Sequence, residues 1–584
     1  WNITTGIQRA TDGLIVDITA RPQPAPPPTH PLLPIPTGVG TRPTDSPRMN
    51  RFPRNSSHGA RSTATASAAV TVLAAAVALL QVCAAQPATY FSGSGTQVAT
   101  GGPAVVVVVE SLGDLQKEWV DGLADKYGAA VGIEATALGD MTGESMVDEL
   151  QSALAATSVL PSAPAQLDQY PVIAFGKAAT LATNLSHAGW PTVVAVCANL
   201  SEVSLPPIDM TIQEADAAPL LLLVSDIEEN GPLVTETEEM LDAAGLHWET
   251  IRYGGTGPEF YLPTSAGYDP STWGRAYEAI TTFIDDALTG GTPGTQDPGT
   301  EVPPGVTVET PFMYEDNGTM LEGYLAYPTE AVAQGMLLPG VVILPDADGL
   351  EGYEFSRAHM LAEMGYVALG ANSYGLPVGE SPANSTQRGE LLNFWRGNPE
   401  MYVRRIRAAV GAVRALSYVN SSAIGMTGYC FGGSGVVFDV LANSDIQVDV
   451  SFHGGISVQP NITTTPPAKP YLTFQSGGAD ESPEDIAWLQ ESLTTMGGEW
   501  DITRYSKVLH AFTAWSRPDR YHPRADGRSW AAMAARFEEF IPSPAGNMSH
   551  SNGTAPPPSD SAAGRASGGA LAAALLALLA LAAA

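Results

Sequence analysis

The sequence predicts an α/β protein with two tandem domains, each built on a mostly parallel sheet with helices on both faces. Between residues 306 and 545, short apolar runs that suit buried strands alternate with helical segments, as is typical of parallel sheets. A strand-like run at 424–427 leads through a glycine-rich turn into a helical run at 436–441. Residues 219–286 repeat the pattern of residues 470–541, which indicates a second copy of the same fold.

The size and charge of the chain narrow the class of protein. Its 584 residues suffice for two to four domains with their own cores. A net charge of −33 argues against binding to nucleic acid and against a polybasic membrane patch. The three cysteines Cys83, Cys197 and Cys430 fall in different segments, so no disulfide framework is expected and an unpaired cysteine is a candidate reactive thiol.

The N-terminal residues are excluded from the predicted fold. Residues 1–48 are rich in Pro and Thr, and we interpret them as disordered or as a non-native upstream segment. Residues 49–85 place three arginines before an apolar run at 68–80 and then small residues, which predicts a secretory signal peptide. The alternative is a membrane anchor, but the run is shorter than the ~20 residues that span a bilayer.

The C-terminal residues carry a matching signal. Small residues around Ser561, a short spacer and an Ala/Leu run to Ala584 predict a GPI-attachment signal over 562–584, with Ser561 as the attachment site. A retained tail anchor is the alternative. Residues 546–561 then form a Pro-rich glycosylated stalk. Acceptor motifs for glycosylation occur at Asn184, Asn199, Asn317, Asn384, Asn420, Asn461, Asn547 and Asn552. We therefore expect a GPI-anchored protein of the secretory pathway at the cell surface.

A Gly- and Pro-rich segment at 290–305 reads as a flexible linker. It divides an N-terminal globular region, 86–289, from a C-terminal one, 306–545.

The elements of the C-terminal region follow in order. Residues 306–327 alternate in places as strands do, and 341–344 is a buried strand that ends at Pro345. A helix at 357–364 and a strand at 367–369 come next, and an amphipathic helix at 402–416 leads to the strand at 424–427. Strands at 448–452 and 471–475 complete the predicted sheet.

Cys430 stands at the tip of the turn after the strand at 424–427. Gly428 and Gly432, two residues to either side, let the strand and the helix pass close together. This strand, turn and helix form the nucleophile elbow of the α/β-hydrolase fold, with sulfur in place of the usual serine oxygen. The helix N-terminus favours a thiolate at this place. The alternative is a buried structural cysteine beside a glycine-rich turn.

An acid and a base follow Cys430 in the chain order of this fold. Asp480 comes just past the strand at 471–475, and His510 past a strand-like run that begins at Ile502. Catalytic groups gather at the C-terminal ends of parallel strands, so we expect Cys430, Asp480 and His510 to meet as a triad. His510 would take the thiol proton and later activate water, while Asp480 holds the imidazole ring.

The motifs at 428–433, 477–480 and 510–512 closely resemble those of the dienelactone hydrolases, over nearly all of residues 306–542. The resemblance implies hydrolysis of an ester or lactone through an acyl-thioester on Cys430. It also implies that Asp346 takes the place of a glutamate that holds the resting thiol, and that the backbone amides of Phe431 and Ala347 form the oxyanion hole.

One feature departs from the dienelactone-specific members. They carry an arginine four residues after the histidine, where this chain has Ala514. Arg517 lies three residues further on, and Arg388 is a candidate for the family's other substrate arginine. The reaction type is therefore carried over and the substrate is not. His453 follows a strand and either lines the pocket or is a satisfied core or rim histidine.

The N-terminal region resembles a degenerate copy of the hydrolase. On the internal alignment Gly176 takes the nucleophile position, Pro258 the base position and the neighbourhood of Glu229 the acid position. Neither Gly176 nor Pro258 can attack or transfer a proton, so this copy cannot run the same reaction. Cys197 is interpreted as a core residue.

The predicted function is therefore hydrolysis of a small-molecule ester or lactone by the second domain. No cofactor, metal or nucleic acid is expected, and the partner of the first domain is unknown. The rival prediction is a non-catalytic cell-surface binding protein that uses two hydrolase-like scaffolds. A pure scaffold has no need of an intact Cys430, Asp480 and His510.

Overall fold

The structure is a computed structural model of the 584-residue chain. It describes residues 4–10, 13–19, 89–93, 104–109, 114–127, 129–134, 171–176, 179–180, 192–198, 200, 219–225, 230–289, 293–460 and 471–545. The predicted signal peptide, stalk and GPI-attachment signal lie outside the described residues. The chain divides into two compact units, residues 1–82 and 83–584.

The first unit contains one described hairpin. Strands β1 (Thr4–Ala10) and β2 (Gly13–Thr19) pair in antiparallel fashion. They lie in the segment that the sequence predicts to be disordered or non-native.

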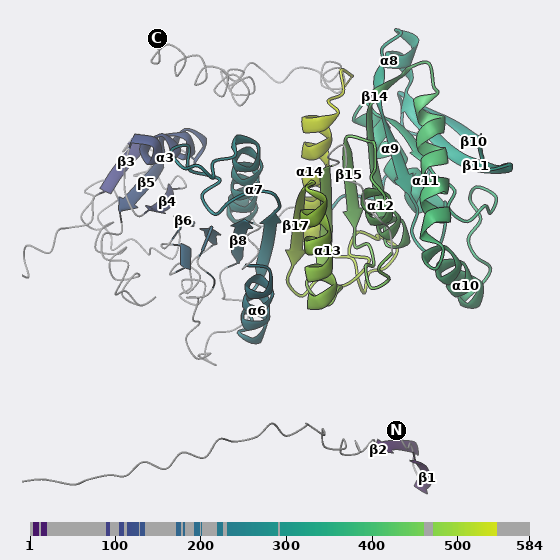
Figure 1. Cartoon of the computed structure of the whole chain (residues 1–584), viewed down its shortest axis with the longest axis horizontal. Helices are drawn as coiled ribbons and strands as arrows, with labels where there is room; N and C mark the ends of the chain where they lie inside the picture. Colours follow the sequence, from purple (N-terminus) through teal and green to yellow (C-terminus); the bar gives the residue numbers. More distant parts are fainter. Residues whose placement is uncertain are drawn as a thin grey trace, which may run out of the picture. The chain divides into compact units, whose positions relative to one another are not determined.

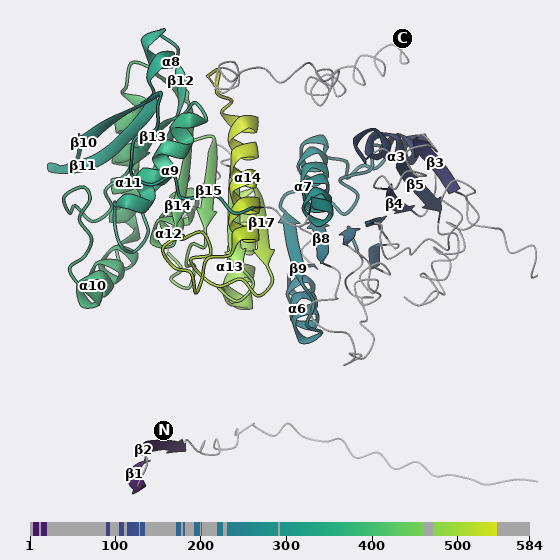
Figure 2. The same cartoon turned by 180° about the vertical axis from the view of Figure 1, so that it is seen from behind.

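The second unit is built on a long mixed sheet (Figures 1 and 2). Its described strands follow one another across the sheet in the order β10 (Val306–Asp316), β11 (Thr319–Pro328), β13 (Val367–Gly370), β12 (Leu338–Leu344), β14 (Val419–Tyr429), β15 (Val448–Phe452), β16 (Tyr471–Gly477), β17 (Glu499–Tyr505), β9 (Trp248–Tyr253), β8 (Leu220–Ser225), β7 (Val193–Val196), β6 (Val172–Phe175), β4 (Ala104–Val109), β5 (Ala129–Glu134) and β3 (Thr89–Gly93). From β13 to β17 all pairs are parallel, as they are from β5 to β9.

Helices cover both faces of the sheet in the C-terminal half. Those described there are α8 (Thr329–Ala333), α9 (Gly352–Glu363), α10 (Ser385–Arg396), α11 (Pro399–Arg414), α12 (Phe431–Leu441), α13 (Pro483–Met496) and α14 (Pro523–Phe540). The N-terminal half contributes α3 (Asp114–Tyr127), α6 (Asn230–Ala243) and α7 (Pro270–Thr289). One apolar core lies under α11, α12 and α13, and a second lies under α9 and α14.

The central strands are apolar on both faces because each core takes alternate side chains. In β12, Val342 and Leu344 enter the first core, while Val341 and Ile343 enter the second. All seven residues of this strand are buried. The three-layer α/β architecture that the sequence predicts is therefore present, and it sets the C-terminal ends of β12, β14, β15 and β16 at one edge.

Two local features differ from the expected elements. Helix α12 begins at Phe431, directly after the cysteine, rather than at 436. Helix α10 was not predicted, because its apolar pattern is weak. Its start is fixed by Asn384, whose side chain accepts the N–H of Gln387 at 3.0 Å.

The N-terminal half repeats the strand order of the C-terminal half. We compare the two halves from their outer strands toward the junction of β17 and β9. The order in the N-terminal half is β3-β5-β4-β6-β7-β8-β9, and the corresponding order in the C-terminal half is β11-β13-β12-β14-β15-β16-β17. Both series begin with an antiparallel pair and continue in parallel. The predicted duplication thus appears as two copies of one topology.

The two copies join through an antiparallel pair of their last strands, β17 and β9. The ladder pairs Asp501 with Tyr253 and Tyr505 with Glu249. Helices α6 and α13 contact one another at this junction, and Arg536 of α14 forms an ion pair with Glu278 of α7 at 2.7 Å. The two domains predicted from the sequence therefore share one sheet.

Residues 293–305 are held against the C-terminal half, although the composition of 290–305 predicts a flexible linker. The carbonyl of Thr295 accepts the indole N–H of Trp515 at 2.8 Å and the hydroxyl of Tyr521 at 2.9 Å. The backbone N–H of Thr295 donates to Asp526 at 2.9 Å. Specific hydrogen bonds override the flexibility that Gly and Pro content indicates.

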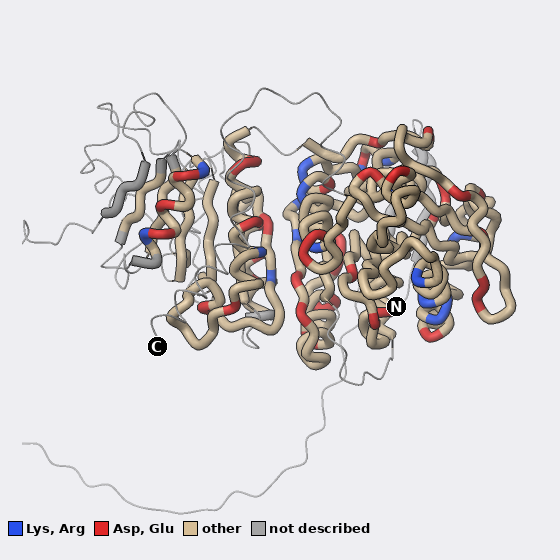
Figure 3. Tube along the Cα trace, turned by 90° about the horizontal axis from the view of Figure 1, so that it is seen from above, with Lys and Arg blue, Asp and Glu red and all other residues tan. Residues whose placement is uncertain are grey.

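Acidic residues are spread over the described part of the chain, with Lys and Arg interspersed (Figure 3). Many arginines are engaged by carboxylates: Arg404 with Asp316, Arg407 with Asp439 and Arg414 with Asp445 are examples on α11. No described helix is long and apolar enough to cross a membrane.

Candidate active site

Cys430 lies between β14 and α12 in a strained backbone conformation. Its φ is 52° and its ψ is −109°, a combination that L-residues rarely adopt. The amide of Cys430 donates to the carbonyl of Phe452 at 3.0 Å. The turn leaves the thiol partly exposed. This is the conformation that the nucleophile elbow requires.

The glycines around Cys430 are required by close backbone approach. A Cβ atom on Gly432 would lie 2.1 Å from the carbonyl oxygen of Leu344, and one on Gly428 would lie 2.4 Å from that of Gly432. A Cβ on Gly433 would lie 2.7 Å from the Cα of Gly454. The elbow is therefore packed directly against the ends of β12 and β15.

The structure brings the three predicted triad residues together. His510 Nε2 lies 3.0 Å from Cys430 Sγ, and His510 Nδ1 lies 2.8 Å from Asp480 Oδ1. The side chain of Asp480 is 5% exposed and that of His510 is 30% exposed. A nucleophile, a base within hydrogen-bond reach and a carboxylate that orients the base form the arrangement used in covalent catalysis.

The environment of His510 favours its protonated form. Burial lowers the pKa of His510, but hydrogen bonds to Asp480 and Cys430 outweigh burial and raise the pKa to about 10. The ring therefore carries two protons at neutral pH, one directed at the carboxylate and one at sulfur. A protonated imidazole beside a cysteine sulfur is the kind of environment in which nucleophilic cysteines are found.

Asp346 does not reach the thiol. Its Oδ1 accepts the backbone N–H of Asp348 at 2.7 Å, and no hydrogen bond joins it to Cys430 among the described residues. Burial raises the pKa of Asp346 to about 6, with further raising by the charges of Asp348 and Glu351. The carboxylate that the family resemblance assigns to the resting thiol thus caps its own turn.

Glu354 is a buried carboxyl to which the sequence pattern assigns no role. Its Oε1 accepts the N–H of Asp346 at 3.1 Å, and its Oε2 accepts the N–H of Glu351 at 3.2 Å. Burial raises the pKa of Glu354 well above the usual range. These two hydrogen bonds fix the loop after β12. The sequence signal that could have identified Glu354 is its spacing of three residues from Glu351, which is that of a capping box.

The two amides proposed for the oxyanion hole lie on segments held side by side. Phe431 stacks on Tyr402 and on Tyr374, with ring centroids 4.7 Å and 5.3 Å apart. The hydroxyl of Tyr374 donates to the carbonyl of Ala347 at 3.2 Å. Tyr374 thus links the segment of Ala347 to the start of α12 at Phe431.

The side chain of His453 is hydrogen-bonded to the backbone of the nucleophile elbow. Its Nδ1 accepts the backbone N–H of Cys430 at 3.1 Å, and its Nε2 lies 2.8 Å from Thr513 Oγ1. The residue is 2% exposed, and burial together with the charge of His510 lowers the pKa of His453 well below its usual value. Of the two interpretations left open by the sequence, the structure matches the satisfied core histidine.

Arg388 and Arg517 both pair with Asp348. Arg388 Nη1 and Asp348 Oδ1 form an ion pair, and Arg517 Nη2 lies 3.3 Å from Asp348 Oδ2. Both arginines were candidates for gripping a substrate carboxylate. Asp348 was missed, although it stands in the same turn sequence as Asp346.

A second missed group lies beside the catalytic acid. Glu481 follows Asp480 in the chain, and its Oε2 accepts the N–H of Ile456 at 3.4 Å. Burial, followed by the charge of Asp480, raises the pKa of Glu481 to about 7. The sequence signal that could have identified Glu481 is its position directly after Asp480, because two adjacent carboxylates raise each other's pKa.

The predicted glycosylation acceptors Asn317, Asn384 and Asn420 are exposed. Asn184, Asn199, Asn461, Asn547, Asn552 and the predicted attachment residue Ser561 lie outside the described residues. Within the described ranges, no group of His, Cys, Asp and Glu side chains could hold a metal ion.

The degenerate copy has the backbone of the site without its chemistry. Gly176 follows β6 with a φ of 58°, and Cys197 follows β7 with a φ of 56°. These places correspond to Cys430 after β14 and His453 after β15. Burial raises the pKa of the Cys197 thiol, and Cys197 packs against the core of the N-terminal half.

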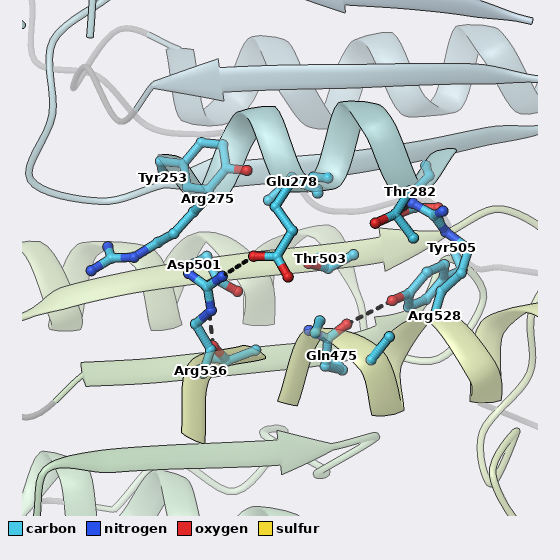
Figure 4. Close-up of a pocket in the computed structure, with 16 residues that line it drawn as sticks. Tyr253, Arg275, Glu278, Thr282, Gln475, Asp501, Thr503, Tyr505, Arg528 and Arg536 are labelled. Atoms are coloured by element: carbon cyan, nitrogen blue, oxygen red, sulfur yellow. Dashed lines mark hydrogen bonds and ion pairs between the residues drawn. The ribbon is translucent and has the colours of Figure 1, made fainter. Parts of the chain in front are cut away.

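A separate cavity lies at the junction of the two halves (Figure 4). It is lined by equivalent residues of both copies, among them Tyr253 and Tyr505. Arg528 pairs with Glu249 at 2.7 Å, and Arg536 with Glu278 at 2.7 Å. Both of these ion pairs cross the junction, and none of the lining residues belongs to the triad.

Strand order, elbow and residue geometry define an α/β-hydrolase fold with a Cys–His–Asp site. Residues 321–541 match the model of the Dienelactone hydrolase family. The match covers less than half of the chain, and over these residues the chain is similar to the dienelactone hydrolase family.

Curated relatives match the same part of the chain. "Protein usf" of Aquifex pyrophilus is 26% identical over 237 residues, which cover 39% of this chain and 97% of the relative. A protein of Aquifex aeolicus assigned as a carboxymethylenebutenolidase is 24% identical over 243 residues, 39% of this chain and 97% of the relative. A Bradyrhizobium protein assigned as a 2-oxo-3-(5-oxofuran-2-ylidene)propanoate lactonase is 25% identical over 226 residues, 37% of this chain and 89% of the relative.

Among solved structures, a dienelactone hydrolase-like promiscuous phosphotriesterase from metagenomic libraries is 24% identical, with a TM-score of 0.37, and covers 41% of this chain and 99% of its own. The structure titled m3DLH is 25% identical, with a TM-score of 0.36 and the same coverage.

Proposed function

We propose that this protein hydrolyses a small-molecule ester or lactone, with Cys430 as nucleophile, His510 as proton carrier and Asp480 as the group that orients His510. The observation that carries the proposal is the contact of His510 Nε2 with Cys430 Sγ at 3.0 Å, with Asp480 on the other ring nitrogen at 2.8 Å. The names of the relatives, a butenolide hydrolase and a lactonase, support an ester or lactone as the substrate.

In the first half-reaction the Cys430 thiolate attacks the substrate carbonyl carbon, and the carbonyl π electrons move to oxygen. The backbone amides of Phe431 and Ala347 would stabilise this oxyanion, and such donors can be worth about 3 kcal/mol each. The oxyanion then collapses, the carbon–oxygen bond of the ester breaks, and the His510 imidazolium gives its proton to the leaving alkoxide. The product of this step is an acyl-thioester on Cys430; with a lactone, the alcohol stays attached to the acyl group.

In the second half-reaction the neutral His510 removes a proton from water as the water oxygen attacks the thioester carbonyl. The carbon–sulfur bond breaks, the carboxylic acid leaves, and the thiolate and imidazolium are restored. Asp480 keeps Nδ1 of His510 protonated throughout, so that Nε2 handles the travelling proton.

The test is hydrolysis of aryl esters and small lactones by the full chain and by its Cys430→Ala variant. We expect a loss of at least about 10³-fold in kcat. Cys197→Ala is the matched control and should retain full activity. Equal rates with and without the Cys430 thiol would refute the mechanism.

The non-catalytic binding protein is tested by thiol labelling. If the site is catalytic, iodoacetamide should modify Cys430 in the folded protein and abolish activity. A folded protein in which Cys430 is not labelled would favour a scaffold that only binds.

We also propose that the protein is exported, glycosylated and attached to the cell surface by a GPI anchor. The support is the pair of sequence signals at 49–85 and 562–584 and the acceptor motifs between them. A phosphatidylinositol-specific phospholipase should release the protein from cells, and continued retention would contradict the anchor.

A further inference from the structure

The position of the catalytic acid depends on the backbone of its loop. Asp480 Oδ1 contacts His510, but Asp480 Oδ2 is buried without a hydrogen-bond partner among the described residues. The N–H of Asp480 donates to the carbonyl of Gly477 at 3.1 Å. The carboxylate therefore has few side-chain contacts to hold it, and its direction follows from the loop that carries it.

Arg504 holds this loop on both sides of Asp480. Its Nη2 donates to the carbonyl of Gly478 at 2.8 Å and to that of Glu481 at 3.4 Å. Arg504 lies on β17 and is only 3% exposed. A buried guanidinium needs a carboxylate partner, because an uncompensated charge in the interior is strongly unfavourable.

That partner comes from the N-terminal half. Glu238 of α6 forms an ion pair with Arg504 Nη1, and it also accepts from Arg252 at 3.1 Å and from Thr250 at 2.6 Å. Glu238 is 2% exposed, so the pair is shielded from solvent screening.

The internal repeat explains why the carboxylate must come from across the junction. Trp248 corresponds to Trp500, and with the same offset Glu238 corresponds to Gln490 of α13. The catalytic half thus has an uncharged side chain where the N-terminal half has a carboxylate. Gln490 accepts from Arg252 at 3.3 Å.

A second contact from the N-terminal half reaches the same loop. A Cβ atom on Gly478 would lie 3.0 Å from the indole Cη2 of Trp248. The indole ring is therefore directly beside Gly478. The backbone of Trp248 is fixed by Ser506, which accepts its N–H at 2.8 Å and donates to its carbonyl at 2.9 Å. The N-terminal half therefore acts on this loop in two ways, through the pair of Glu238 with Arg504 and through Trp248 beside Gly478.

We propose that Glu238 and Trp248, which belong to the half without a nucleophile, are positioning residues for the catalytic acid Asp480. Glu238 acts by holding Arg504, which holds the carbonyls of Gly478 and Glu481. The degenerate half is in this way a built-in part of the catalytic site. The proposal rests on the proposed function for its kinetic readout, and its chemical readout does not require an ester substrate.

The experiment compares Glu238→Gln with Glu239→Gln in the full chain. Glu239 is the exposed neighbour on the same helix and serves as the matched control. In a background that carries both Cys83→Ala and Cys197→Ala, Cys430 is the remaining cysteine of the chain, and the rate of iodoacetamide alkylation at pH 6 reports how well His510 activates its sulfur. We expect Glu238→Gln to slow alkylation by about tenfold or more and to lower kcat by a similar factor at nearly unchanged KM. Glu239→Gln should change neither.

A purely structural role is excluded by a double-mutant cycle. If Glu238 acts through Asp480, Glu238→Gln should have little further effect when Asp480→Asn is already present. Additive losses, or alkylation rates equal to those of Glu239→Gln despite a lowered melting temperature, would overturn the proposal. If Glu238→Gln does not fold, Trp248→Phe tests the second contact: slower alkylation supports the proposal and an unchanged rate contradicts it.

The outcome also separates this proposal from the proposed function. A chain with rapid, Glu238-dependent alkylation and no ester or lactone hydrolysis would refute the hydrolase assignment and leave the positioning role standing. Ester or lactone hydrolysis that is unaffected by Glu238→Gln would support the hydrolase assignment and refute the positioning role of Glu238.

Discussion

Ile251 of β9 and Thr503 of β17 pair with each other across the junction of the two halves, and each is the counterpart of the other in the internal repeat. The same ladder pairs Asp501 with Tyr253 and Glu249 with Tyr505. An approximate twofold axis therefore passes between Ile251 and Thr503. The two copies are arranged like the subunits of a symmetric dimer within one chain.

This arrangement protects the last strand of each copy. An open strand edge invites pairing with other chains, and here β17 and β9 cover one another. Arg275 of α7 and Arg528 of α14 both lie five positions after the proline that begins their helix, Pro270 and Pro523. Arg275 contacts Glu539 at 2.8 Å across the junction, as Arg528 contacts Glu249. The N-terminal copy can therefore lack a nucleophile and still be retained, because its last strand and its helix α7 contact the catalytic half.

The first prediction concerns the pH dependence of acylation. Because the pKa of His510 is raised to about 10, the proton for the leaving group is present below that pH and is lost as pH rises through it. We expect kcat/KM to fall above about pH 10. Asp480→Asn removes a group that raises the pKa, so it should move this alkaline limb to lower pH and reduce kcat by about 10²–10⁴-fold.

The check is a pH–rate profile of kcat/KM for both proteins on one aryl ester. An alkaline limb at the same pH in Asp480→Asn would show that Asp480 does not control the proton on His510.

The second prediction concerns His453, which shares the amide N–H of Cys430 with the carbonyl of Phe452. His453→Asn keeps a hydrogen-bond acceptor, and Asn tolerates the positive φ of 40° at this position. His453→Gly also tolerates this φ but provides no acceptor. We expect His453→Gly to lower kcat by about tenfold or more, and His453→Asn to recover a substantial part of that loss.

Measured kcat for the two variants, with melting curves, decides the matter. Equal losses in His453→Gly and His453→Asn would indicate that filling the space matters and the acceptor does not. Since burial keeps the pKa of His453 well below its usual value, neither variant should alter the pH profile between pH 6 and 8.

The family and site were largely predictable because they depend on local signals in the chain. Gly428, Cys430 and Gly432 fix a turn by sterics, and Asp480 and His510 follow strands whose apolar runs are plain in the sequence. Once the parallel sheet is predicted, its geometry places such residues at one edge.

The remaining features depend on side-chain partners that are distant in sequence. Asp346 was expected to hold the thiol, but the N–H of Asp348, two residues away, competes for its carboxylate. Arg388 and Arg517 were candidates for contacting the substrate, and Asp348 engages both. The pairing of Glu238 with Arg504 joins residues 266 positions apart, and no local pattern predicts it.

The third prediction follows from the Asp348 pairs. With Arg388 and Arg517 engaged by a carboxylate, the site should prefer uncharged esters over esters that carry a second carboxylate. Asp348→Asn frees both guanidinium groups, which bind carboxylates well. We expect the ratio of kcat/KM for an aryl hemisuccinate to that for an aryl butyrate to rise about three- to tenfold.

Salt should reduce this gain, since both arginines are partly exposed. Asp519→Asn, at an aspartate whose side chain is 77% exposed, is the control. An unchanged ratio in Asp348→Asn would mean that neither arginine reaches the acyl group of the substrate.

The fourth prediction concerns the buried pair of Arg357 and Asp526. The two side chains are 0% and 1% exposed, with Nη2 and Oδ1 2.9 Å apart. Asp526 also accepts the N–H of Thr295 in the segment that joins the halves. Asp526→Ala would leave a buried guanidinium without its carboxylate, which typically costs about 3–5 kcal/mol.

We therefore expect Asp526→Ala to lower the free energy of unfolding by about that amount, with the joining segment becoming more sensitive to proteases. Asp519→Ala, with its exposed carboxylate, should change the free energy of unfolding by less than about 0.5 kcal/mol. Replacing both members of the pair, with Arg357→Met added to Asp526→Ala, should restore part of the loss because the stranded charge is removed. If the double variant is no more stable than Asp526→Ala, the loss comes from the hydrogen bonds to Thr295 rather than from the uncompensated charge.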